Sequence, residues 1–242
     1  MNICGKLLQK QQNISDYPGV TITFLGDSVT QGCFEAYLED DATIATVFDQ
    51  ENGYHHHLAH MLSVLYPAVP INIINSGISG GTAPHGLERL ERDVLRYSPD
   101  LVVVCFGLND AMAGTEGLQR YLDAMDSILT RLQYENVETI FMTPNMMCTR
   151  IDPSITNPAI ANTARAVCRI QTEGVLDTYI QGARDLCARR NVVLCDCYRK
   201  WQMLHQNGVD ITNLLSNRIN HPTKEMNKLF AVSLLETILY KE

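Results

Sequence analysis

The chain has 242 residues, a formal net charge of -8 and a pI of about 5.3. This length suits one α/β domain that buries enough surface to fold without disulfides or structural metals. The acidic balance argues against a nucleic acid or an anionic membrane as the main partner. No signal peptide and no membrane span are visible, and Cys105 and Cys195 lie in apolar runs. These features predict a reduced, cytoplasmic protein.

Strand-like and helix-like segments alternate along the chain, which predicts a mostly parallel sheet with helices on both faces. No Pro-, Gly- or Ser-rich linker interrupts the sequence. We therefore expect one domain over residues 1–242, with 1–19 as an N-terminal extension. The predicted strands are 20–25, 70–75, 101–106, 137–143 and 191–196. The predicted helices are 54–66, 85–96, 117–133, 175–190 and 224–239.

Two stretches, 33–52 and 144–158, show no clear periodicity. Each follows a predicted strand, so both should overhang the carboxyl edge of the sheet. Loops at this edge commonly shape binding sites. We expect both stretches to border a ligand site, although a plain surface connection is the simpler interpretation for any single residue in them.

The tripeptide Gly26-Asp27-Ser28 directly follows the first predicted strand. A serine delivered to this edge, together with the distant His221, suggests acyl transfer. The segment is not a Gly-x-Ser-x-Gly elbow, because Thr30 stands where the second glycine belongs. It is also neither a phosphate-binding loop nor a dinucleotide fingerprint. Taken alone, the tripeptide is equally consistent with a turn capped by Asp27 or Ser28.

Two further segments follow the second and third predicted strands. Residues 75–82 contain three glycines, whose backbone N–H groups can approach a ligand or an oxyanion. Residues 106–110 contain Asn109, whose side-chain amide can donate to a developing negative charge. Each segment could be a plain turn. Three such turns at the edge that carries Ser28 favour a catalytic site.

Together with His221-Pro222, these ordered motifs resemble the SGNH/GDSL hydrolase superfamily over most of the chain. The resemblance implies a flavodoxin-like three-layer α/β/α sandwich with a central five-stranded parallel sheet. It also implies esterase, lipase, thioesterase or carbohydrate-deacetylase chemistry that needs no metal and no other cofactor.

The resemblance also assigns roles to individual residues. Ser28 is the expected nucleophile and His221 the expected general base. Gly80 and Asn109 match the family's oxyanion donors, completed by the backbone N–H of Ser28. Gly77 is an alternative to Gly80, although the run of small residues at 80–82 favours Gly80.

The sequence departs from the family three residues before the histidine, where Arg218 replaces the usual aspartate. Arginine has no acceptor atom, so it cannot orient the imidazole. We expect its side chain to face solvent or an acidic loop. The Nδ1 proton of His221 would then be held by a backbone carbonyl within 217–220, by the Asn217 side chain or by a carboxylate such as Asp210. We favour a carbonyl, because Asp210 could equally cap a following helix at 211–215. Asp27, by its place in the motif, orders the turn.

Two apparent metal motifs carry less weight. His56 and His60 are four residues apart on a predicted helix, so both could face one metal ion. The metalloprotease pattern, however, requires a glutamate at the position that His57 occupies. Cys195 and Cys197 would point to one face of a strand, yet no second cysteine pair is suitably spaced. We expect solvated or capping histidines, buried thiols and no metal site.

The sequence therefore predicts a serine ester hydrolase that acts on small esters, with O-acetylated carbohydrate as the first candidate substrate. A lipase, a lysophospholipase or a thioesterase of the same family is the alternative. A catalytically weakened ligand-binding protein on this fold is another, since His221 lacks its acid partner. A flavodoxin-like nucleotide binder is disfavoured, because the phosphate loop is missing.

Overall fold

Five parallel strands form the centre of the computed structural model, which describes residues 2–38 and 44–240. Their order, β4-β1-β5-β6-β7, places the first strand of the sheet between the second and the third. The predicted five-stranded parallel sheet is thus confirmed, and its crossover direction reverses beside β1, where open α/β sheets bind ligands. The strands are β1 (Val20–Gly26), β4 (Ile71–Gly77), β5 (Leu101–Cys105), β6 (Glu138–Met142) and β7 (Val193–Cys195).

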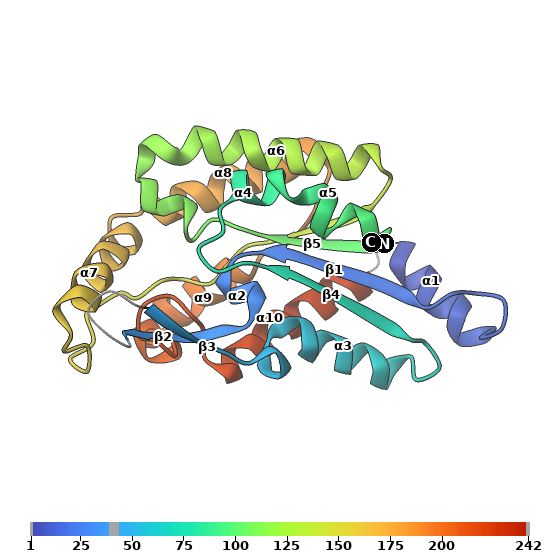
Figure 1. Ribbon diagram of the computed structural model, residues 1–242, viewed down its shortest axis with the longest axis horizontal. Helices are drawn as coiled ribbons and strands as arrows, with labels where there is room; N and C mark the ends of the chain where they lie inside the picture. Colours follow the sequence, from blue (N-terminus) through green and yellow to red (C-terminus); the bar gives the residue numbers. More distant parts are fainter. Residues whose placement is uncertain (1, 39–43, 241–242) are drawn as a thin grey trace.

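Helices cover both faces of this sheet, which gives the predicted three-layer sandwich (Figure 1). One face carries α4 (Ala83–Glu88), α5 (Leu90–Asp93), α6 (Leu118–Tyr134) and α8 (Val175–Arg190). The opposite face carries α3 (Tyr54–Leu65), α9 (Cys197–Gln206) and α10 (Lys224–Leu239). All five residues of β5 are buried, as expected for a parallel strand covered on both sides.

Short helical elements connect these layers, and several of them begin at the carboxyl edge of the sheet. Helix α2 (Ser28–Gln31) follows β1 directly. The 3-10 helices are η1 (Gln50–Asn52), η2 (Leu95–Tyr97), η3 (Asp110–Ala113), η4 (Thr115–Gly117) and η5 (Ile211–Leu214). In the described ranges, no helix combines the length and the apolar character that crossing a membrane requires.

Five elements lie where no regular structure was expected. Helix α1 (Asn2–Gln12) occupies the presumed extension and buries Ile3 and Leu7 in the core. Strands β2 (Cys33–Leu38) and β3 (Ile44–Phe48) form an antiparallel hairpin within the stretch 33–52. Helices α7 (Pro158–Thr172) and α9 were also not predicted. The apolar stripe of α1 is only two residues long, and the hairpin has a register shift near Cys33, so neither leaves a clear periodic pattern.

The predicted helix 85–96 is wrong as one element, because it is divided into α4, α5 and η2. The break lies at Arg89, whose backbone leaves the helical region (φ -105°, ψ 5°). Its side chain is buried and donates hydrogen bonds to the carbonyls of Gly26 and Ser76 at the ends of β1 and β4. The helix breaks there because the guanidinium is held at the strand ends.

Candidate active site

Ser28 begins α2 immediately after the end of β1, at the carboxyl edge of the sheet. The Oδ1 atom of Asp27 caps this short helix by accepting a hydrogen bond from the N–H of Val29 at 3.0 Å. The residue that orders the turn is therefore Asp27, as its motif position suggests. Ser28 itself is 7% exposed, so its hydroxyl lies at the bottom of a pocket and remains reachable.

His221 reaches Ser28 from the loop between η5 and α10. The distance between Ser28 Oγ and His221 Nε2 is 2.9 Å, which is hydrogen-bonding distance. The loop is held by a bridge between Leu215 and Pro222 and by the N–H of Ser216, which donates to the His221 carbonyl at 2.8 Å. The fold thus brings together the two residues that the sequence paired across 193 positions.

Burial lowers the pKa of His221 from 6.5 to about 4, while a hydrogen bond to the backbone carbonyl of Phe34 acts in the opposite direction. The imidazole is therefore neutral at neutral pH, as a general base must be. Phe34 lies in β2, outside the range 217–220 where we expected a carbonyl partner. Sequence reasoning missed it because the contact depends on how the hairpin folds back over the histidine loop.

The Asn217 side chain lies beside Nδ1 of His221, the ring nitrogen that does not contact Ser28. Its Oδ1 accepts hydrogen bonds from the N–H groups of Ile219, Asn220 and His221, each at 3.0 Å. These bonds fix the orientation of the amide, so its Nδ2 faces His221 Nδ1 at 3.2 Å. Nδ1 therefore faces an amide donor, where a triad would place a carboxylate.

Neither the carboxylate candidate Asp210 nor Arg218, which we expected to face solvent or an acidic loop, has a hydrogen bond to the imidazole among the described residues. Arg218 adopts a left-handed backbone conformation (φ 59°), and its guanidinium donates to the carbonyl of Asn213 at 2.9 Å. Asp210 caps η5 through the N–H of Thr212 and forms an ion pair with Arg150 at 2.8 Å. Asp210 thus acts as the helix cap that we considered as its alternative role.

The glycine-rich segment after β4 and the segment after β5 meet beside Ser28. Gly80 has a positive φ of 73° and borders the pocket, whereas the N–H of Gly77 is already bound to Asn75 Oδ1 at 3.0 Å. Asn109 also borders the pocket, and its Nδ2 donates to the carbonyl of Gly81 at 2.9 Å. The amide nitrogen carries two hydrogens, so one remains to meet an oxyanion.

These groups border a cavity of about 310 Å³. One wall is apolar and comes from α7, which presents Ile160 and Val167, with Ile219 beside them. The hairpin contributes Cys33 and Thr46, so the stretch 33–52 does border the site. The expectation was wrong for the stretch 144–158, which leads into α7 and contributes no residue to the described lining of this cavity.

Two buried carboxyl groups, those of Asp27 and Asp110, lie where α2 and η3 begin. Burial raises the pKa of Asp27 from 3.8 to about 7, and the nearby charge of Asp110 acts in the same direction. Burial likewise raises the pKa of Asp110 to about 6, partly opposed by the N–H of Ala83, which donates to its Oδ1 at 2.9 Å. Within the described residues, Oδ2 of Asp110 has no hydrogen-bond partner. Burial therefore favours the protonated form of both carboxyl groups.

The histidine cluster is divided between different environments. His55 is buried, and its Nε2 lies 2.9 Å from Asn75 Nδ2, whereas His56 and His60 are exposed. Across 2–38 and 44–240, no three His, Cys, Asp or Glu side chains are arranged to hold a metal ion. Cys197 begins α9 instead of extending the strand, and its Sγ lies 3.7 Å from that of Cys195 in the core.

Comparison with known proteins places this geometry in context. The model of the GDSL-like lipase/acylhydrolase family matches residues 24–229. An acetylxylan esterase from Geobacillus stearothermophilus is 30% identical over 135 residues, which cover 52% of this chain and 60% of that esterase. The aligned region is therefore less than two thirds of the relative's length.

Solved structures share the fold at low sequence identity. Axe2, an acetylxylan esterase from Geobacillus stearothermophilus, superimposes with a TM-score of 0.68 at 22% identity, covering 93% of this chain and 96% of that one. The acetyl xylan esterase AlAXEase gives a TM-score of 0.67 at 21% identity, covering 91% and 100%. BT4096, described as a gut microbial diltiazem-metabolizing enzyme, gives 0.67 at 20% identity, covering 91% and 47%.

Proposed function

Because the chain belongs to the GDSL-like lipase/acylhydrolase family, we propose that it is a serine ester hydrolase that works through an acyl-serine intermediate. The observation that carries this proposal is the 2.9 Å contact between Ser28 Oγ and His221 Nε2. The contact lies in a pocket that Gly80 and Asn109 also border. A nucleophile, a base and oxyanion donors around one cavity are what acyl transfer requires.

In the proposed mechanism, Nε2 of His221 takes the proton of Ser28 as Oγ attacks the ester carbonyl. The oxyanion of the tetrahedral intermediate is bound by the N–H groups of Ser28 and Gly80 and by the Asn109 amide. The intermediate collapses as His221 protonates the leaving alcohol. Water, activated by the same histidine, then hydrolyses the acyl-serine.

We propose O-acetylated carbohydrate as the substrate class. The support comes from the acetylxylan esterases of similar sequence and fold. The pocket supports it as well, since its volume of about 310 Å³ is small and it opens to solvent beside exposed Gly80. A small acyl group at Ser28 with a hydrated sugar at the mouth fits this shape.

The test compares wild type, Ser28→Ala and the control Ser127→Ala on acetylated xylo-oligosaccharides and on p-nitrophenyl acetate. Ser127 is an exposed serine of α6, so its loss should leave turnover unchanged. Ser28→Ala should abolish hydrolysis and keep its unfolding midpoint, because the hydroxyl acts in chemistry more than in packing. Turnover close to wild type in Ser28→Ala would contradict the serine mechanism.

A second candidate substrate is an ester with a longer apolar acyl chain, as a lipase or thioesterase would use. The apolar wall formed by Ile160, Val167 and Ile219 favours it. A p-nitrophenyl ester series from acetyl to octanoyl separates the two. A kcat/KM that falls from acetyl to butyryl supports the carbohydrate deacetylase, whereas a maximum at longer chains supports the second candidate.

A further inference from the structure

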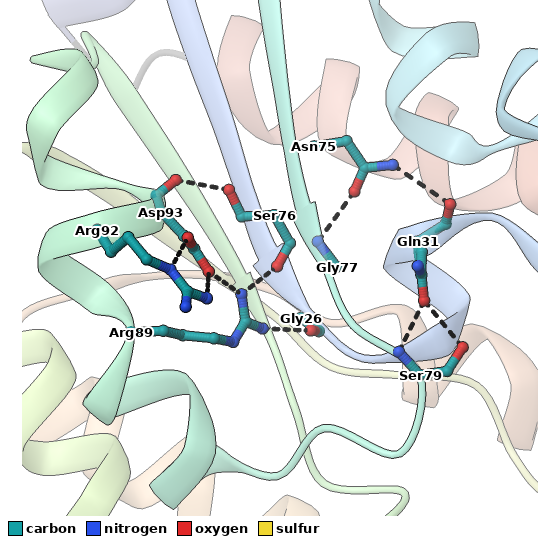
Figure 2. Close-up of polar contacts among 9 residues, drawn as sticks. All are labelled: Gly26, Gln31, Asn75, Ser76, Gly77, Ser79, Arg89, Arg92 and Asp93. Carbon is teal, nitrogen blue, oxygen red and sulfur yellow. Dashed lines mark hydrogen bonds and ion pairs between the residues drawn. The ribbon is translucent and has the colours of Figure 1, made fainter.

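One side chain joins the helix of the nucleophile to the segment of the oxyanion glycine. Gln31 ends α2, and its Oε1 accepts hydrogen bonds from the backbone N–H of Ser79 at 2.7 Å and from Ser79 Oγ at 2.8 Å (Figure 2). Ser79 directly precedes Gly80, and both residues border the cavity with Ser28. The two hydrogen bonds from Ser79 to Gln31 therefore connect the helix that carries Ser28 to the residue next to Gly80.

The segment around Gly80 is held after the glycine by Asn109, whose Nδ2 donates to the carbonyl of Gly81 at 2.9 Å, and before the glycine by Gln31. Gly81 donates to the carbonyl of Ile78 at 2.9 Å, which closes a turn with Ser79 and Gly80 at its centre. Gly80 is exposed, and among the described residues other than its chain neighbours no atom lies within 4 Å of the place where its Cβ would stand. The central peptide of a β-turn can adopt two orientations, and glycine accommodates both at its third position. Packing around Gly80 does not select between them.

The base of the segment is held independently of the Gln31 side chain. A Cβ at Gly77 would lie 2.2 Å from the backbone nitrogen of Gln31, so β4 packs directly against α2. Asn75 Nδ2 donates to the carbonyl of Gln31 at 3.3 Å, and the N–H of Ile78 donates to the carbonyl of Gly26 at 3.1 Å. These contacts hold residues 75–78, whereas Ser79 and the Gly80 that follows it are tied to α2 through Oε1 of Gln31.

We propose that Gln31 is a positioning residue that holds the N–H of Gly80 in register with Ser28 for oxyanion binding; this inference rests on the proposed esterase function. Two donors of Ser79 on one acceptor fix the residue that supplies the carbonyl of the central peptide, which restrains that peptide to the orientation with positive φ at Gly80. Gln31 acts through Gly80 and touches neither the substrate nor the reacting atoms. Its effect belongs to the transition state, so it appears in kcat and leaves KM unchanged.

The experiment measures kcat and KM on p-nitrophenyl acetate for Gln31→Met, Gln31→Glu and Gln181→Met. Loss of a whole oxyanion donor costs about 100- to 1000-fold in kcat, so a misplaced donor should cost at least about tenfold in Gln31→Met. Gln31→Glu keeps an acceptor for both donors and should retain kcat within about threefold of wild type. Gln181→Met removes an exposed glutamine that bonds within α8 and should change nothing.

The pH profile provides a readout that a general loss of structure would not give. The acidic limb of kcat/KM reports His221, so it should stay in place in Gln31→Met while the plateau falls. A kcat in Gln31→Met within twofold of wild type, or a Gln31→Glu variant as slow as Gln31→Met, would overturn the inference. An inactive wild type would instead overturn the proposed function.

A second variant covers the case in which Gln31→Met does not fold. Ser79→Ala removes the hydroxyl donor and leaves the backbone N–H on Gln31, so it should lower kcat by about two- to fivefold, a fraction of the loss of a whole donor. An unchanged kcat in Ser79→Ala, with Gln31→Met unfolded, would also overturn the inference.

Discussion

The side of His221 that faces away from Ser28 determines how well it can serve as a base. In a triad, a carboxylate accepts the Nδ1 proton and stabilises the imidazolium. Here Nδ1 lies 3.2 Å from the amide nitrogen of Asn217, and a carbonyl from Phe34 is the acceptor that supports the protonated ring. A donor at Nδ1 favours the tautomer whose proton is on Nε2, the nitrogen that accepts the proton of Ser28 in the proposed mechanism.

Asn217→Asp should therefore increase activity. Oδ1 would keep its three backbone hydrogen bonds, and the new Oδ2 would take the place of Nδ2 as an acceptor beside Nδ1. Nδ2 now also donates to Asn220 Oδ1 at 2.9 Å, so the Asn220 amide would have to turn its nitrogen toward the new carboxylate. We expect kcat to rise by about tenfold or more, a part of the ~10⁴-fold effect that a triad aspartate has in a complete triad. The acidic limb of the pH profile should also move to higher pH, because a carboxylate stabilises the imidazolium.

Asp210→Ala serves as the comparison for Asn217→Asp. This carboxylate is bound to Arg150 and Thr212, so its loss should leave kcat near wild type. If Asn217→Asp folds and kcat does not rise, the Phe34 carbonyl already orients the ring fully. A large drop in kcat for Asp210→Ala would instead reinstate Asp210 as the acid.

Asn109 is the second residue whose role can be measured directly. Asn109→Ala should lower kcat by about 100- to 1000-fold, the usual effect of removing one oxyanion donor. KM on p-nitrophenyl acetate should change little, because the amide acts mainly on the transition state. A sharp rise in KM at constant kcat would mean that Asn109 binds the ground-state substrate.

At the scale of elements, Arg89 links the break between α4 and α5 to the ends of β1 and β4. Its Nη2 donates to the carbonyl of Gly26 at 2.9 Å and its Nη1 to the carbonyl of Ser76 at 2.5 Å (Figure 2). Arg89→Met should lower the free energy of unfolding by about 2–4 kcal/mol, because it leaves two buried carbonyls without these donors. Urea unfolding measures this loss.

The matched control is Arg92→Met, which removes the exposed neighbour in the same ion-pair group. Within the described part of the chain Arg92 pairs with Asp93 alone, which Arg89 also contacts, so the unfolding midpoint should hardly move. Equal losses in the two variants would mean that Asp93, and not the strand-end carbonyls, accounts for the stability.

The sequence predicted the elements whose pattern is local. Helices α8 and α10 begin and end where expected, since each has a long periodic stripe. The break at Arg89 could not be predicted, because it depends on carbonyls of two strands that are distant in sequence. The family prediction is confirmed by the match over residues 24–229.

The same limit applies to the site. Ser28 and His221 could be predicted as partners because each belongs to a short motif, and their side chains lie 2.9 Å apart. The contacts of Phe34 and Gln31 were not predicted, because they depend on where the hairpin and the glycine-rich turn fold. Positioning by an unremarkable side chain leaves no signal in a single sequence.

At the scale of the whole molecule, two sets of buried groups make the folding stability respond to pH in opposite directions. Burial raises the pKa of Asp27 to about 7 and that of Asp110 to about 6, from 3.8 for both. Burial lowers the pKa of His55 and of His221 to about 4, from 6.5 for both. All four groups therefore bind different numbers of protons in the folded and unfolded states within one range of pH.

The sign differs between the two sets. Between pH 3.8 and about 6 to 7 the two aspartates are protonated in the folded state and ionised in the unfolded state. Their contribution to folding stability is therefore full below pH 3.8 and is lost as pH rises through the folded-state pKa values. The unfolded state binds protons on the histidines between about pH 4 and 6.5, so their contribution is full above 6.5 and is lost as pH falls. Between about pH 4 and 6 the two effects oppose each other.

We expect urea unfolding midpoints of the wild type to vary little over this range, whereas Asp110→Asn should lose stability steadily as pH falls from 6.5 to 4. An asparagine at position 110 keeps an oxygen that accepts the N–H of Ala83, but it cannot bind a proton. The variant therefore loses the proton uptake that offsets the effect of the histidines on stability as pH falls. His221→Asn should do the reverse and become more stable relative to the wild type as pH falls. The difference in unfolding midpoint between each variant and the wild type removes the effect of the surface carboxylates, because these titrate alike in all three proteins. Slopes of the same sign in both variants would show that these buried groups do not control the pH dependence of folding.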